Sequence, residues 1–303
     1  MRLEFRPARA ADLAQVSSVF ASAIDDLNRK HGFFERPTST SPPNPLYSFW
    51  LKKDPSSFWV AEEGDRVVGY TFSFLRGSLW FLADLFISPT FQGKGVGRSL
   101  IQKTLSSWKG HRIGNRALIT PAFNRSSVSL YMRFGMYPRQ PVYFAAASRE
   151  DVAQGLKRTR SQELQVEEVA EPDSSKLSNI HRLAMGFPAG WHNEYFSRVQ
   201  KARCILFRKN GRLEGYGFLG RDGRVGPLVV KSEQSFKDAL EGTLDIAASG
   251  SSKEVTMFFA GTNRDAVQAS IRHGFRITYP LLFLSARPMG DWGNYLFYSP
   301  GLM

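Results

Sequence analysis

The sequence predicts an α/β protein built from two copies of one fold, each a mixed sheet flanked by helices. Three observations carry this prediction. The chain has 303 residues, about the length of two ordinary domains. Strand patterns alternate with helix patterns along each half, which is typical of mixed sheets with helices on their faces. The order of the patterns in the second half matches the order in the first, as expected for a tandem duplication.

Periodicity and turn signals define the elements of the first half. Residues 3–7 alternate between apolar and charged and predict a strand, and residues 11–27 carry apolar side chains at helical spacing. Two further strands are separated by Glu63-Gly64-Asp65, a hairpin signal. Strands are expected at 58–62, 66–75, 79–87, 116–121 and 141–146, and helices at 46–52, 98–108 and 125–134.

The second half repeats this rhythm more faintly. Asn210-Gly211 separates two strand patterns and is a strong signal for a tight hairpin turn. Strands are expected at 164–170, 202–209, 213–220, 225–230, 254–260 and 281–286, and helices at 174–185, 235–248 and 264–273. The order of these elements matches the order in the first half.

Two polar segments mark the organisation of the chain. Residues 147–163 are charged and carry no strand signal, so we expect a first domain at 1–148, a linker at 149–163 and a second domain at 164–303. Residues 30–45 are rich in Pro and Ser and predict a long loop inside the first domain, where long loops are often functional.

Composition excludes several classes of protein. The net charge is +13, from 40 Lys and Arg against 27 Asp and Glu, which favours anionic partners such as nucleic acid or a polyphosphate cofactor. No basic run exceeds two residues, so general anion steering is favoured over a specific nucleic-acid site. No run of 18 apolar residues predicts a membrane span, and the amino-terminus lacks a signal-peptide pattern, so we expect a cytoplasmic protein.

Metal and hydrolase chemistry find no support in the sequence. The one cysteine, Cys204, lies in an apolar strand pattern and is expected to be a buried thiol. The five histidines stand at no metal-ligand spacing, so no metal site is expected. The chain has no Gly-x-Ser-x-Gly motif of a serine hydrolase.

A glycine-rich turn, Gln92-Gly93-Lys94-Gly95-Val96-Gly97, separates a strand from a helix. Glycines allow backbone N–H groups to approach an anion, and the helix N-terminus adds partial positive charge. The turn lacks the Gly-Lys-Ser/Thr of a P-loop and the G-x-G-x-x-G of a dinucleotide fold. A pyrophosphate is therefore the expected ligand, and Lys94 and Arg98 add full positive charges beside it.

This turn, the strand Asp84-Leu85-Phe86-Ile87 before it and the later segment 124–136, with its Asn, Leu-Tyr and Phe-Gly, resemble the GNAT N-acetyltransferases. The resemblance covers about residues 1–146. It implies a mostly antiparallel sheet in each half and acetyl-CoA as the cofactor, with a strand splayed by a bulge to pair with the pantetheine. The positions that match the family's cofactor residues are Leu85, Phe86, Ile87, Gln92, Gly93, Lys94, Gly95, Val96, Gly97, Arg98, Asn124, Ser127 and Tyr131.

The resemblance also implies direct attack of an amine on the thioester through a tetrahedral intermediate. Tyr131 stands at the family's general-acid position, and the alternative is a tyrosine that packs in the core. The family's usual base positions hold Phe81 and Ala83, which accept no proton. Asp84 is the nearest carboxyl, but strand alternation sends it to the opposite face unless the bulge rotates it. A water chain, a group from the second half or an already neutral acceptor are the alternatives.

The second half resembles the degenerate C-terminal domain of two-domain GNAT proteins. Residues 231–236 hold no glycine and include Glu233, which would repel phosphate, whereas 262–275 echo the Asn and Gly-Phe helix. The aromatic stretch 291–298 is expected to pack rather than to bind the acceptor. We expect a small-molecule amine as substrate, with a non-catalytic acyl-CoA-binding module or a protein or ribosome-associated acetylase as alternatives. The sequence leaves the acceptor's identity and the oligomeric state open, a monomer with tandem halves among the possibilities.

Overall fold

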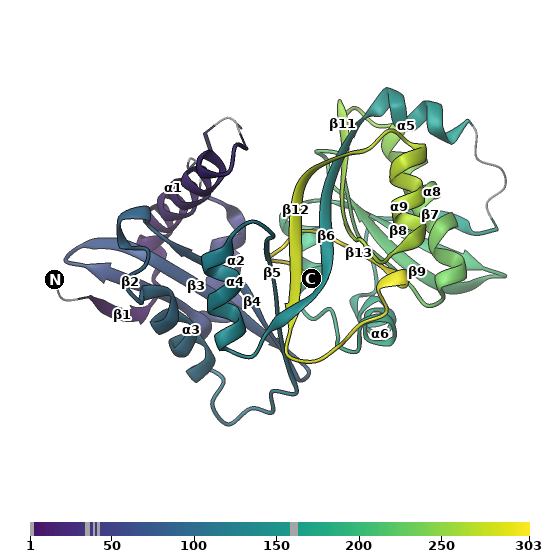
Figure 1. The fold of residues 1–303 in the computed structure, drawn as a ribbon. Helices are drawn as coiled ribbons and strands as arrows, with labels where there is room; N and C mark the ends of the chain where they lie inside the picture. The colour runs from purple at the N-terminus through teal and green to yellow at the C-terminus, as the bar shows by residue number, and fades with distance from the viewer. Residues whose placement is uncertain (1–2, 34–36, 39, 41–42, 158–162) are drawn as a thin grey trace. The chain divides into compact units, whose positions relative to one another are not determined.

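The computed structural model describes residues 3–33, 37–38, 40, 43–157 and 163–303. The chain divides into two compact units. Unit 1 comprises Met1–Leu118 and Phe123–Phe134, and unit 2 comprises Ile119–Ala122 and Gly135–Met303. Both are mixed, mostly antiparallel sheets flanked by helices (Figure 1), which confirms the predicted fold class.

The sheet of unit 1 has the order β1-β2-β3-β4-β5. Its strands are β1 (Glu4–Pro7), β2 (Phe58–Glu63), β3 (Arg66–Arg76), β4 (Leu79–Ile87) and β5 (Asn115–Pro121). The first four pair antiparallel, and β4 pairs parallel with β5. Each of these strands lies where alternation and turn residues predicted one.

The helices of unit 1 cover both faces of that sheet. They are α1 (Leu13–Lys30), α2 (Pro45–Lys53), α3 (Val96–Ser106) and α4 (Arg125–Arg133). On one face, Trp50 of α2 stacks on Phe72 of β3 with ring centroids 4.3 Å apart. Ser73, the next residue of β3, points to the other face and hydrogen-bonds Thr104 of α3 at 2.6 Å between the hydroxyl oxygens. Alternation along β3 thus assigns α2 and α3 to opposite faces.

The sheet of unit 2 has the order β12-β6-β11-β13-β10-β9-β8-β7. Its strands are β6 (Tyr137–Ser148), β7 (Gln165–Val169), β8 (Arg203–Lys209), β9 (Arg212–Leu219), β10 (Arg224–Val230), β11 (Glu254–Ala260), β12 (Arg276–Ser285) and β13 (Tyr295–Phe297). Its helices are α5 (Arg149–Leu156), α6 (Ser174–Met185), α7 (His192–Glu194), α8 (Phe236–Ala248) and α9 (Arg264–Arg272), with a π-helical turn at Tyr195–Val199.

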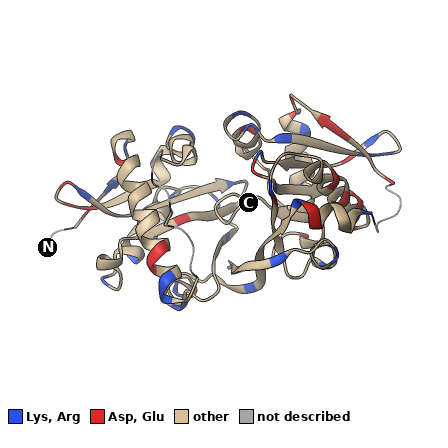
Figure 2. Ribbon diagram, turned by 90° about the horizontal axis from the view of Figure 1, so that it is seen from above, with Lys and Arg blue, Asp and Glu red and all other residues tan. Residues whose placement is uncertain are grey.

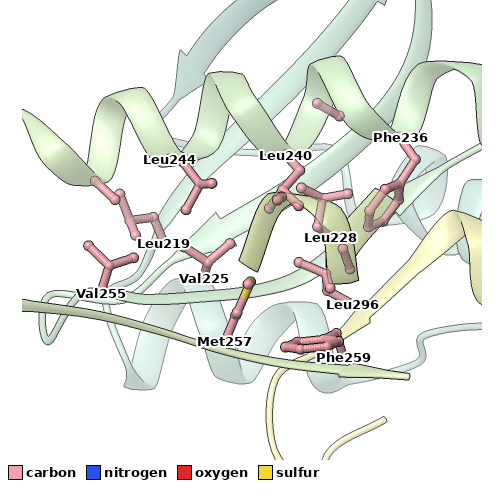
Figure 3. Close-up of a cluster of buried hydrophobic side chains, with 14 of the residues drawn as sticks. Leu219, Val225, Leu228, Phe236, Leu240, Leu244, Val255, Met257, Phe259 and Leu296 are labelled. Carbon is pink, nitrogen blue, oxygen red and sulfur yellow. The ribbon is translucent and has the colours of Figure 1, made fainter. Parts of the chain in front are cut away.

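The hydrophobic core of unit 2 lies under helix α8. Leu240 and Leu244 of this helix, both fully buried, point toward apolar side chains of the sheet (Figure 3). The sheet contributes Leu219, Val225, Leu228, Val255, Met257, Phe259 and Leu296. This core draws on β9, β10, β11 and β13, so it depends on pairing between segments that are distant in the sequence.

The predicted domain boundary does not coincide with the boundary between the compact units. Strand β6 was assigned to the first domain, but it pairs antiparallel with β11 on one side and β12 on the other, inside unit 2 (Figure 1). The predicted linker also holds a helix, α5, whose N-cap Ser148 accepts a hydrogen bond from the Asp151 N–H at 3.0 Å. The β6 difference arises from pairing with strands that are distant in the sequence. The rest of the predicted linker at 158–162, and part of the 30–45 loop, lie outside the described residues.

A repeated segment shows how the two sheets correspond. Strand β3 begins Arg66-Val67-Val68-Gly69-Tyr70-Thr71-Phe72, and β9 begins Arg212-Leu213-Glu214-Gly215-Tyr216-Gly217-Phe218. Each strand pairs antiparallel with the strand that follows it, Tyr70 opposite Phe86 of β4 and Tyr216 opposite Val229 of β10. β3–β4 in unit 1 and β9–β10 in unit 2 are therefore equivalent hairpins of the duplicated fold.

Candidate functional site

The glycine-rich turn leads into the N-terminus of α3 as predicted, although the helix begins at Val96 rather than at Arg98. Gly93 and Gly95 have φ of 76° and 82°, in the left-handed region that favours glycine. A Cβ at either position would meet no atom within 4 Å, so the turn faces open space. Lys94 and Arg98 are exposed beside it. The turn thus combines accessible backbone N–H groups, two cations and a helix N-terminus, a set suited to phosphate.

Apolar packing fixes the position of this turn. Val96 and Leu100 on the first turns of α3 are buried against Ala61, Val68 and Phe91. Leu85 and Ile87 of β4 pack on the same cluster. The Gln92 side chain donates from Nε2 to the backbone oxygen of Ile87 at 3.0 Å, which ties the turn to the end of β4. Strand, turn and helix therefore form one anchored piece.

Strand β4 carries the bulge that the family resemblance implies. Phe72 lies opposite Asp84 and Ser73 opposite Leu82, so Ala83 is the extra residue on β4. Before the bulge, Leu79–Leu82 pairs with Asn115–Leu118 of β5, and within unit 1 this pairing ends there while β4 continues to Ile87. The backbone of Leu85–Ile87 pairs with β3 on its other side. An extended amide ligand would pair with the remaining edge of this strand.

The bulge also decides where Asp84 points. Directly paired residues on neighbouring strands share a face, so Phe81 lies on the face of Phe74, and Asp84 on the face of Phe72. Phe72 and Phe74 are two residues apart on β3 and share one face. Asp84 is therefore on the face of Phe81, one of the family's base positions. The extra residue rotates Asp84 in the way that simple alternation would have forbidden.

One tyrosine contacts the Asp84 carboxylate, and a second tyrosine contacts the first. The Tyr70 hydroxyl of β3 donates to Asp84 Oδ2 at 3.0 Å, and the hydroxyl oxygens of Tyr47 and Tyr70 are 2.9 Å apart. Burial raises the pKa of Asp84 to about 7, and the Tyr70 hydrogen bond opposes this rise. Phe86 stacks on Tyr70 and meets Phe20 of α1 edge to face on the same side. The sequence analysis missed Tyr47 and Tyr70; the recurrence of Gly-Tyr-x-Phe in both halves was the available signal.

The predicted residues of α4 have clear structural partners. Asn124 is the N-cap of α4, and its side chain accepts from the Ser127 N–H at 3.2 Å. Asn263 caps α9 of unit 2 in the same way, so this asparagine has a folding role in both halves. Tyr131 is buried on α4 with 5% of its surface exposed. Before Asn124, Phe123 stacks on Phe33 with centroids 4.6 Å apart, so the start of the long loop contacts the turn that precedes α4.

Unit 2 has no comparable glycine-rich turn at the equivalent place, residues 231–236. Its strand β10 pairs with β11 only at Arg224–Val225, after which β13 enters and pairs antiparallel with both strands. The fully buried Leu296 of β13 lies opposite both Leu228 and Phe259. A protein strand thus fills the opening between the strands equivalent to β4 and β5. The aromatic stretch 291–298 packs, as the sequence predicted.

The described residues offer neither a low-pKa thiol nor a metal-ligand cluster as a second candidate site. The buried Cys204 thiol has its pKa raised to about 12 by burial, which disfavours the reactive thiolate. No cluster of His, Cys, Asp and Glu suited to a metal ion is found in the described part of the chain. None of the helices within the described ranges is long and apolar enough to cross a membrane. Lys and Arg are spread among Asp and Glu through both units (Figure 2).

Comparisons with known proteins agree with this geometry. Residues 22–136 match the model of the acetyltransferase (GNAT) family. A 115-residue stretch is 27% identical to an L-2,4-diaminobutyric acid acetyltransferase of Nocardia farcinica, and it covers 35% of this chain and 60% of that relative. The chain thus spans less than two thirds of the relative that it matches.

Solved structures resemble the fold over almost the whole chain. A putative acetyltransferase from Pyrococcus horikoshii has a TM-score of 0.77 at 16% identity and covers 99% of this chain and 96% of its own. A tandem GNAT protein from the clavulanic acid biosynthesis pathway has a TM-score of 0.61 at 17% identity, with coverages of 95% and 99%. At these identities the likeness concerns the fold alone.

Proposed function

Residues 22–136 match the acetyltransferase (GNAT) family, and on this premise we propose that the protein transfers the acetyl group of acetyl-CoA to the amine of a small molecule. The observation that supports this most is that three features suited to acetyl-CoA lie in one continuous strand–turn–helix segment. The splayed strand β4, a short 3-10 turn at Pro89–Phe91, the open glycine turn and the N-terminus of α3 follow one another along the chain. The relative named for diaminobutyric acid supports a small amine as acceptor.

The residues present fit the cofactor. Gly93 and Gly95 leave a turn that no side chain fills, and the adjacent Lys94 and Arg98 complement the charge of a pyrophosphate. The edge of Leu85–Ile87 suits the amides of a pantetheine, and Val96 and Gly97 at the helix start contribute N–H groups. When bound, acetyl-CoA supplies the acetyl group as an activated thioester. We propose a single site of this kind per chain, in unit 1.

Proton transfers are assigned to two side chains. Asp84 Oδ1 or Oδ2 accepts the proton of the acceptor's ammonium, so that the nitrogen lone pair becomes available for attack. A carboxylate with pKa about 7 is half ionised near neutral pH and is matched to this task. The Tyr131 hydroxyl donates a proton to the departing thiolate. The backbone N–H of Phe86 or Ile87 stabilises the developing oxyanion.

The test is acetyl transfer across a panel of amines. Thiol release from acetyl-CoA is followed with 2,4-diaminobutyrate, other diamino acids, polyamines, aminoglycosides and peptides with free N-termini or lysines, and each product is identified by mass spectrometry. We expect at least one small amine to raise thiol release well above the rate without acceptor. Acetylation of peptides alone would contradict the proposed substrate class. Acetyl-CoA binding without transfer to any amine would indicate a non-catalytic module.

A further inference from the structure

We propose that Tyr47 and Tyr70 form a hydrogen-bonded chain that positions Asp84 and sets the pH at which it takes up a proton. This inference deepens the proposed function, because it concerns the residue assigned there as base. It assigns roles to two side chains that lie outside the phosphate turn and outside α4. Both are positioning residues, since they act through the carboxylate.

The geometry fixes the donor and the acceptor of each hydrogen bond between Tyr47, Tyr70 and Asp84. Tyr70 Oη is 3.0 Å from Asp84 Oδ2, and an ionised carboxylate can only accept, so the Tyr70 proton points to Asp84. A hydroxyl has one proton, so Tyr70 must accept from Tyr47, whose Oη is 2.9 Å away. Both protons of the chain are then oriented toward Asp84. Successive hydrogen bonds of this kind polarise one another and strengthen the last one.

Burial of both tyrosines keeps water away from their hydroxyl groups. Tyr70 is fully buried and Tyr47 is 2% exposed, so water does not replace either hydroxyl. Burial raises the pKa of both phenols, which keeps them protonated and able to donate at neutral pH. Phe58 and Trp50 surround the Tyr47 ring, and Phe86 stacks on the Tyr70 ring. The rings are therefore held by aromatic packing, and the hydroxyls remain to act on Asp84.

No other charge competes for the carboxylate among the described residues. On β3, Tyr70 donates to the side chain of Asp84, and Thr71 donates to its backbone oxygen at 2.9 Å. On α2, Tyr47 is a neutral phenol whose pKa the Asp84 charge helps to raise, and on α1 the neighbouring Phe20 is apolar. No Lys, Arg or His of the described chain forms an ion pair with Asp84, unlike the Arg6–Asp12 pair of the same unit. The tyrosine chain is thus the main favourable partner of the ionised form.

Unit 2 supplies a matched comparison. Tyr216 occupies the position in β9 that Tyr70 has in β3 and is also fully buried. In place of a bulge with an acid, β10 has Gly226 and Pro227 at the register shift. The groups that act on Tyr216 are Tyr295, Cys204 and Asn193, none of them a carboxylate. Both units have a tyrosine at this position, but of the two only Tyr70 hydrogen-bonds a carboxylate.

The experiment follows the titration of Asp84 directly in the full-length protein without substrate. Aspartate labelled with ¹³C at Cγ gives carboxyl NMR signals, and loss of one signal in Asp84→Asn assigns it. Tyr70→Phe removes a donor to the charged form, so we expect the Asp84 pKa to rise by about one unit, a tenfold gain in proton affinity. Tyr47→Phe should shift it in the same direction by less. Tyr216→Phe, which removes an equally buried hydroxyl, should leave it unchanged.

Two readouts separate this inference from the proposed function. If an amine is acetylated, the acidic limb of the kcat/KM profile should move to higher pH in Tyr70→Phe, by the same amount as the NMR titration. If no amine is acetylated, the NMR titration still tests whether the two tyrosine hydroxyls set the Asp84 pKa. An Asp84 pKa that does not move in Tyr70→Phe or Tyr47→Phe, or that moves equally in Tyr216→Phe, would overturn the inference. Should Tyr70→Phe fail to fold, Tyr47→Phe carries the test.

Discussion

Replacing Asp84 by Asn removes a titrating carboxylate from β4 and keeps the shape of the side chain. Asparagine still accepts the Tyr70 hydrogen bond through its Oδ1. In the wild-type protein the Asp84 side chain is half-buried, and burial raises its pKa from 3.8 to about 7. The folded protein therefore binds this proton more tightly than the unfolded chain does. Stability from this group is fully present below pH 4 and is lost as the pH rises to 7.

The size of the effect follows from the shift. Each pKa unit corresponds to about 1.4 kcal/mol, and roughly two units of the shift lie between pH 5 and pH 7, which sets an upper limit of about 3 kcal/mol. Water that reaches a half-buried carboxylate reduces this to about 1–2 kcal/mol. The amide in Asp84→Asn does not titrate. Relative to the wild type, the variant should therefore gain about 1–2 kcal/mol of unfolding free energy between pH 5 and pH 8.

Urea unfolding of both proteins at pH 5 and pH 8 measures this gain. The difference between the variant and the wild type at each pH cancels the other titrating groups, and the change in that difference isolates Asp84. A difference that stays constant within about 0.5 kcal/mol, or that moves against the variant at high pH, would refute the argument. In that case Asp84 would be an ordinary solvated carboxylate and a poor base at neutral pH.

Two further substitutions test other parts of the account. Tyr131→Phe should lower kcat about 100-fold with little change in Tm if the hydroxyl protonates the thiolate, whereas a core role predicts a lower Tm with turnover intact. Gly155→Ala in α5 would place a Cβ 2.2 Å from His273 Nδ1 and 2.9 Å from the Arg272 oxygen, so we expect a loss of about 1–3 kcal/mol in urea unfolding. The exposed Gln154→Ala is its control, and equal stability of the two variants would mean that α5 does not pack on α9.

Local patterns carried much of the fold. Hairpin signals at 63–65 and at Asn210-Gly211 placed β2–β3 and β8–β9, and helical spacing placed α6 at Ser174–Met185. Each of these depends on residues that are near in sequence. The turn at 92–97 was recognisable for the same reason, because glycines determine its conformation. The start of α3 at Val96 was missed because Gly97 reads as a turn residue.

The pairing of strands that are distant in the sequence could not be predicted from local patterns. Strand β13 has three residues, and nothing in Tyr295–Phe297 says that it enters between β10 and β11. The insertion of β6 between β11 and β12 is equally invisible in its own sequence. Helix α5 did carry a local signal, a serine at the N-cap position. The Ser148 Oγ accepts a hydrogen bond from the Asp151 N–H, as expected of an N-cap. The polar composition of 147–163 masked that signal.

The orientation of Asp84 shows a more specific limit. Strict alternation assigned it to the wrong face, because one extra residue at Ala83 reverses every later position of β4. The sequence contains no mark of that bulge apart from the family resemblance. The proposed role of Asp84 thus depends on a single backbone irregularity, which the pairing of β4 with β3 reveals.

Calorimetric titration with acetyl-CoA tests the central claim, a single phosphate-binding turn in unit 1. We predict one acetyl-CoA per chain, since β13 fills the equivalent opening of unit 2. Gly95→Asp adds a side chain and a negative charge at a left-handed position and should weaken binding at least tenfold. Gly211→Asp makes the same change at φ 75° in the open β8–β9 turn and should bind as the wild type does. Two molecules per chain, or unchanged affinity in Gly95→Asp, would contradict the account.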